Sequence, residues 1–68
     1  MSVWFYYLGN YDSNVGIENV MFFNFNPNIH HLSVKYYDGR KELFENVDFI
    51  SNVYDSKMED SQHEILPI

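Results

Sequence analysis

Residues 31–49 constrain the fold more than any other stretch, because two β-prone runs flank the dipeptide Asp38-Gly39. Asp-Gly between such runs is a strong hairpin signal, since a type I′ turn needs positive φ at both central residues. A two-residue loop would place Lys35 opposite Glu42, a favourable cross-strand pair of charges. The sequence therefore predicts an antiparallel hairpin around which the rest of the chain folds.

Four segments have the character of strands. They are residues 3–8, 17–25, 31–37 and 41–49. The first (VWFYYL) is apolar at every position, which predicts a central strand or one covered on both faces. Residues 9–14 (GNYDSN) are rich in turn formers and predict a loop. We therefore expect a mostly β domain over residues 1–54, a small antiparallel sheet of about four strands.

The fourth segment has a second interpretation. A continuous apolar stripe at helical spacing is formed by Leu43, Val47, Ile50 and Tyr54. A helix over residues 42–54 would make the domain α+β and would place Glu42, Glu45 and Asp48 on its opposite face. The abundance of Phe and Val favours the strand, with a bulge at residues 45–46.

From residue 55 onward the composition changes. Residues 55–68 contain no aromatic residue, and four acids there outnumber a single Lys. This segment therefore carries −3 of the net charge of −6. The pattern predicts an acidic C-terminal tail, flexible or folded into a short helix, that ends in the apolar sequence ILPI.

Size and charge limit the classes of function. A chain of 68 residues without cysteine predicts one small domain without disulfides, and its aromatic residues are expected to supply the core and a homodimer interface. The net charge of −6 opposes direct binding to nucleic acid and to anionic membranes, and it favours a basic partner. The N-terminal sequence lacks the features of a signal peptide, so we expect a cytoplasmic protein.

The residue patterns do not favour catalysis, a cofactor or a metal site. The serines stand in no nucleophile motif. His30 and His31 are adjacent, so on a strand they would point to opposite faces and could not easily share one metal ion. Residues 12–16 lack the terminal glutamate of a calcium loop. The expectation is a non-enzymatic protein without a cofactor.

The acidic residues remain as candidates for a partner-binding site, because they are spread through the chain. They are Asp12, Glu18, Asp38, Glu42, Glu45, Asp48, Asp55, Glu59 and Asp60. Duplex DNA carries about one charge per 1.7 Å of its axis, so carboxylates on a compact particle can match a subset of its phosphates. The alternative is a solvated acidic surface that only keeps the protein soluble.

In size, charge and composition the chain resembles the small, acidic, aromatic- and Asn-rich phage proteins that inhibit host enzymes or DNA-binding proteins. The resemblance rests on the length, the charge of −6, the lack of Cys and Ala, and the scattered acids. It involves no motif and assigns no residue a role. It implies an inhibitor and DNA mimic that binds a basic host protein, with DNA-binding proteins as the expected partners. The alternatives are an immunity protein or antitoxin that caps a toxin, and a small structural subunit of a larger assembly.

Overall fold

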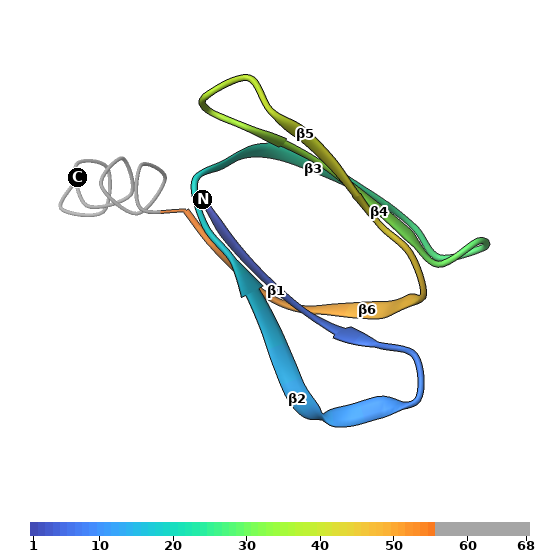
Figure 1. Cartoon of the computed structure of the whole chain (residues 1–68). Coiled ribbons are helices and arrows are strands. Elements are labelled where there is room, and N and C mark those ends of the chain that lie inside the picture. The colour runs from blue at the N-terminus through green and yellow to red at the C-terminus, as the bar shows by residue number, and fades with distance from the viewer. Residues whose placement is uncertain (56–68) are drawn as a thin grey trace, which may run out of the picture.

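The computed structural model describes residues 1–55, and this part of the chain forms six strands. They are β1 (Ser2–Tyr7), β2 (Asn10–Ile17), β3 (Val20–Asn26), β4 (His31–Tyr36), β5 (Lys41–Phe44) and β6 (Val47–Tyr54). One sheet has the order β2-β1-β6 and the second the order β3-β4-β5, and every pairing is antiparallel. The two sheets face each other (Figure 1). The predicted mostly β, antiparallel fold is confirmed, with six strands in two sheets where about four in one sheet were expected.

Residues 42–54 form strands and not a helix, so the α+β alternative is wrong. β5 ends at Phe44 and β6 begins at Val47. Between them, Asn46 has a φ of 60°, a left-handed conformation that Asn adopts more readily than most residues. The predicted fourth strand is therefore divided by a turn that carries the chain from the second sheet to the first. Within residues 1–55 there is no helix that could cross a membrane.

The hairpin at Asp38-Gly39 forms, but its loop is one residue longer than predicted. The backbone N–H of Tyr36 donates to the carbonyl of Arg40 at 2.9 Å, and the N–H of Gly39 donates to the carbonyl of Tyr36 at 3.0 Å. Gly39 has a φ of 92°. This is the geometry of a three-residue loop whose last residue takes the left-handed position, where Gly carries no steric cost.

The longer loop shifts the pairing of β4 with β5 by one residue. Lys35 lies opposite Lys41 and not opposite Glu42. Because side chains alternate along a strand, such a shift moves every side chain of β5 to the other face of the sheet. Leu43 is consequently 52% exposed on the outer face, whereas Phe44 packs against the core.

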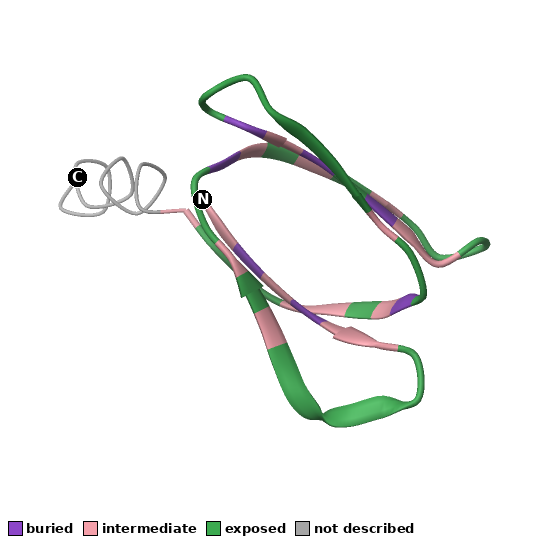
Figure 2. Ribbon diagram, viewed as in Figure 1, coloured by how far each residue is buried: buried purple, intermediate pink, exposed green. Residues whose placement is uncertain are grey.

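The core lies between the two sheets, and buried residues occur along both β1 and β4 (Figure 2). The buried residues are Val3, Phe5, Val20, Leu32, Val34, Tyr36 and Val47. Full burial of a side chain such as Phe5 contributes roughly 1.5–3 kcal/mol. Each sheet therefore has one face fixed by the core and one face turned outward.

Backbone hydrogen bonds join the two sheets at both ends. The amino group of Met1 donates to the carbonyl of Val20 at 2.7 Å, and the N–H of Val20 donates to the carbonyl of Met1 at 2.9 Å. At the other end the N–H of Val47 donates to the carbonyl of His30 at 2.9 Å. Nδ1 of His30 also lies 3.0 Å from the carbonyl oxygen of Val47. The spacing of the sheets is thus set by the backbone as well as by core packing.

β1 is the central strand of its sheet, as its apolar sequence predicts, but the core covers only one of its faces. Val3 and Phe5 are fully buried, while Trp4 and Tyr6 point outward and stay partly exposed. Of residues 9–14, predicted to be a loop, residues 10–14 form the first part of β2 and Gly9 lies in the turn before it. The middle of β2 bows away from β1, because residues 11–14 lie opposite the single residue Tyr6 (Figure 1).

Candidate functional site

An aromatic surface lies on the outer side of the first sheet. This aromatic face consists of Trp4, Tyr6, Tyr11 and Phe49. The ring of Tyr6 lies 5.2 Å from that of Phe49 and 6.3 Å from that of Tyr11, centroid to centroid. Tyr11 and Phe49 stack at 6.4 Å with an interplanar angle of 19°. Tyr11 is 53% and Phe49 44% exposed, so the rings contact one another and also the solvent.

A bulge in β6 shapes the edge of the aromatic face. Tyr6 pairs with Phe49. The next residue, Tyr7, pairs with Val47, which leaves Asp48 as the extra residue of the bulge. Bulges re-aim a side chain relative to the regular alternation of a strand. Here the bulge places a carboxylate beside the rings.

Asp48 is tied to the aromatic face through Tyr11. The hydroxyl of Tyr11 donates a hydrogen bond to Oδ2 of Asp48 at 2.5 Å. This hydrogen bond is the main cause of a raised pKa of the Tyr11 phenol, because the protonated form is the donor. The contact holds the bowed part of β2 against β6, and it keeps an anionic oxygen next to exposed rings.

Trp4 packs against Gly16, its cross-strand neighbour in β2. A Cβ atom at position 16 would lie 2.5 to 2.6 Å from carbons of the indole ring, so the ring occupies the space of a side chain there. A second bulge in β6, at Ser51, contacts the backbone of β1 at Trp4. The Ser51 hydroxyl donates to the carbonyl of Trp4 at 3.1 Å and accepts from Nδ2 of Asn14 at 2.8 Å. All three strands of the first sheet thus contribute to the surroundings of Trp4.

The predicted carboxylates do not meet in one site. Asp12 lies in β2, Glu18 between β2 and β3, Asp38 in the β4–β5 turn, Glu42 in β5, Glu45 in the β5–β6 turn, Asp48 in β6 and Asp55 after β6. Glu59 and Asp60, with the rest of residues 56–68, lie outside the described residues. The three acids expected on one helix face are divided between two sheets and a turn, because residues 42–54 form strands.

Two of the predicted carboxylates have close partners in the second sheet and its turn. Nε of Arg40 donates to Oδ2 of Asp38 at 2.8 Å. The backbone N–H of Arg40, and then its guanidinium, lower the pKa of Asp38. The hydroxyl of Tyr36 donates to Oε1 of Glu42 at 2.6 Å. These acids are therefore engaged in local structure.

Charge divides unequally between the two sheets. The strands of the first sheet contain Asp12 and Asp48 and, over their described length, no Lys or Arg. The Lys and Arg residues of the described range 1–55 are Lys35, Arg40 and Lys41, and all belong to the second sheet or its hairpin turn. The aromatic face accordingly has the Asp48 carboxylate beside it and no Lys or Arg in the described strands of its own sheet.

Metal ligation finds no support in the described part of the chain, where no group of three or more His, Cys, Asp or Glu side chains could hold an ion. The two adjacent histidines have separate surroundings. His30 faces the carbonyl oxygen of Val47, and Nε2 of His31 lies 3.8 Å from Oε1 of Glu45.

Sequence reasoning assigned the aromatic residues to the core and a dimer interface, and it did not identify the aromatic face. A signal was present in β1, where Val3 and Phe5 point to one face of the strand and Trp4 and Tyr6 point to the other. Indole and phenol rings carry a polar group that suits a surface position, so the face with Trp4 and Tyr6 favoured exposure to solvent.

Comparisons of the chain with protein-family models, with curated proteins and with solved structures found no match. The functional assignment therefore depends on the chemistry of the chain itself.

Proposed function

We propose that the protein is a non-enzymatic inhibitor that binds a basic surface of a DNA-binding protein and blocks the access of DNA. The observation that carries the proposal is the composition of the first sheet, which combines exposed rings with Asp12 and Asp48 and contains no Lys or Arg in its described strands. Aromatic faces attract Lys and Arg side chains, and carboxylates pair with the same groups. A DNA-binding groove offers both kinds of cation.

The net charge supports the approach of such a partner. A charge of −6 on 68 residues creates a field that extends beyond individual contacts and speeds association with a basic surface. Asp12, Glu18 and Glu45 are exposed at separate places around the molecule. Their scatter suits long-range steering, while the aromatic face supplies short-range contacts. Because the Debye length falls to about 8 Å at physiological salt, binding should weaken steeply as salt rises.

The test is a pull-down from bacterial lysate with the tagged full-length protein, repeated with duplex DNA as competitor. We expect the pull-down to retain a DNA-binding protein that duplex DNA displaces. In a gel-shift assay, the inhibitor should then dissociate the complex of this protein with labelled duplex DNA. A retained protein that DNA does not displace would contradict the proposal.

Matched variants locate the binding surface. The double variant Asp12→Asn with Asp48→Asn removes two charges from the first sheet, and Glu18→Gln with Glu45→Gln removes two from the connections between sheets. We expect the first pair to weaken inhibition at least tenfold more than the second, which corresponds to about 1.4 kcal/mol. Equal losses would contradict the assignment to the first sheet.

A further inference from the structure

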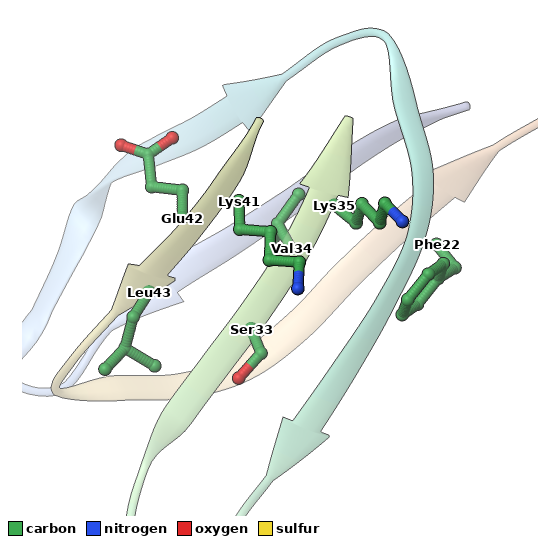
Figure 3. Close-up of a pocket in the computed structure, with 7 residues that line it drawn as sticks. All are labelled: Phe22, Ser33, Val34, Lys35, Lys41, Glu42 and Leu43. Atoms are coloured by element: carbon green, nitrogen blue, oxygen red, sulfur yellow. The ribbon is translucent and has the colours of Figure 1, made fainter. Parts of the chain in front are cut away.

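A hollow of about 500 Å³ lies on the outer side of the second sheet, the side turned away from the first sheet (Figure 3). Phe22, Ser33, Lys35, Lys41 and Leu43 contribute to its lining. This volume falls within the range of small-ligand sites, about 300–1,000 Å³. The hollow therefore has room for a small molecule, and it shares no residue with the aromatic face.

Two rows of cross-strand neighbours form the hollow. Phe22 pairs with Lys35, and Lys35 pairs with Lys41, which gives one row across β3, β4 and β5. In the next row Ser33 of the central strand pairs with Leu43. Ser33 has the smallest side chain among these neighbours, so it forms a low floor between larger walls. Phe22 is 54% and Leu43 52% exposed, which leaves apolar walls open to a ligand.

The two lysines form an uncompensated pair of charges. Like charges directly opposite on neighbouring strands destabilise a sheet. Within residues 1–55, neither Lys35 nor Lys41 has an acidic group at ion-pair distance. Figure 3 shows the Lys41 side chain crossing β4 and the Lys35 side chain extending toward Phe22. An anion in the hollow would relieve their repulsion.

Glu42 also borders the hollow, but its carboxylate is engaged elsewhere. It accepts the hydrogen bond of the Tyr36 hydroxyl at 2.6 Å. Figure 3 shows the carboxylate directed away from Ser33. The carboxylate keeps its charge but forms no ion pair with Lys35 or Lys41, so both ammonium groups can contact a ligand.

We propose that the hollow binds a small amphipathic carboxylate, one carboxylate group attached to a short aliphatic chain. The carboxylate would lie with the ammonium groups of Lys35 and Lys41, and the chain would contact Phe22 and Leu43. A single negative charge is favoured, because the net charge of −6 repels polyanions. This inference stands apart from the proposed function, since it uses the opposite sheet.

The test is a titration of the ¹⁵N-labelled full-length protein with sodium octanoate, followed by amide chemical shifts. We expect saturable shifts at residues 22, 33–35 and 41–43, and at least tenfold weaker binding of octan-1-ol, which has the same chain without the charge. Equal affinity for both probes, or shifts centred on the aromatic face, would overturn the proposal.

Two matched variants separate local from overall charge. Lys41→Gln and Arg40→Gln each remove one positive charge from neighbouring positions of the same hairpin, and only Lys41 lines the hollow. We expect Lys41→Gln to weaken octanoate binding about tenfold and Arg40→Gln to change it less than twofold. The amide spectrum of each variant reports whether it keeps the fold. Full affinity in a folded Lys41→Gln variant would overturn the proposal.

Discussion

The hydroxyl of Tyr36, a buried residue of the central strand β4, donates a 2.6 Å hydrogen bond to Oε1 of Glu42 on the edge strand β5. The guanidinium carbon of Arg40 lies 4.5 Å from the centroid of the same ring. Burial, followed by the hydrogen bond to Glu42, raises the pKa of Tyr36 to about 12. The hairpin turn is thereby connected to the core through one phenol.

The protein should lose stability as the pH rises from about 10 to about 12. An unfolded Tyr has a pKa of about 10, so the folded protein holds this proton more tightly than the unfolded chain does. The resulting stabilisation is complete below pH about 10 and is lost as the pH rises through the folded pKa. Urea unfolding at a series of pH values measures the loss. Tyr36→Phe should flatten this part of the profile. A Tyr36→Phe profile that falls as steeply as that of the wild type would refute the assignment.

Gly16→Ala should displace the ring of Trp4, because the new methyl group would meet indole carbons at 2.5 to 2.6 Å. We expect a loss of about 0.5–1.5 kcal/mol in the free energy of unfolding, the usual cost of an off-rotamer side chain, because Gly16 is exposed and the clash is with a side chain alone. Trp4 is the single Trp of the chain, so its fluorescence emission reports the displacement directly. Ser13→Ala, an exposed position of the same strand, is the control and should leave the emission unchanged. Wild-type emission from Gly16→Ala would show that the ring does not occupy this space.

Asp48→Asn should lower the pKa of the Tyr11 phenol toward its ordinary value. The hydrogen bond to the Asp48 carboxylate is the largest cause of the raised pKa, and a neutral amide accepts a weaker bond. Titration of the Tyr ring carbons by NMR measures the change. Asp12→Asn removes the same charge from the neighbouring residue of β2 without touching this bond. A Tyr11 pKa that responds equally to both variants would indicate general electrostatics in place of the specific contact.

Lys41→Glu should stabilise the protein by about 0.2–1 kcal/mol, because it replaces a like-charge pair with an attractive pair opposite Lys35. Lys41→Gln, which only removes the repulsion, should give a smaller gain. Chemical denaturation of the two variants measures both. In the register predicted from a two-residue loop, position 41 would not face Lys35. Lys41→Glu would then not be more stable than Lys41→Gln.

The hairpin illustrates what sequence reasoning can and cannot reach. Asp38-Gly39 correctly located the turn, because Gly supplies the positive φ that the loop requires. The same dipeptide fits loops of two and of three residues. The alternation of β4 is identical in both cases, and the four residues of β5 mix charged and apolar side chains on either face. The sequence pattern therefore could not distinguish a loop of two residues from one of three.

The aromatic face was missed for a related reason. An apolar run such as residues 3–8 predicts a strand that is buried on both faces, but it does not identify what packs against the second face. The bulges at Asp48 and Ser51 also leave no signal in a period-2 pattern. A homodimer that buries these rings was one expectation from the sequence, and it stays a prediction that sedimentation can measure.

Within residues 1–55, the unequal sharing of Lys and Arg between the two sheets creates an electric dipole across the thickness of this part of the molecule. In the field of a distant basic body this dipole favours an orientation in which the sheet without Lys and Arg leads. An approaching small anion would turn it the other way. The two proposed surfaces face in opposite directions, so a ternary complex is geometrically allowed and neither ligand has to displace the other.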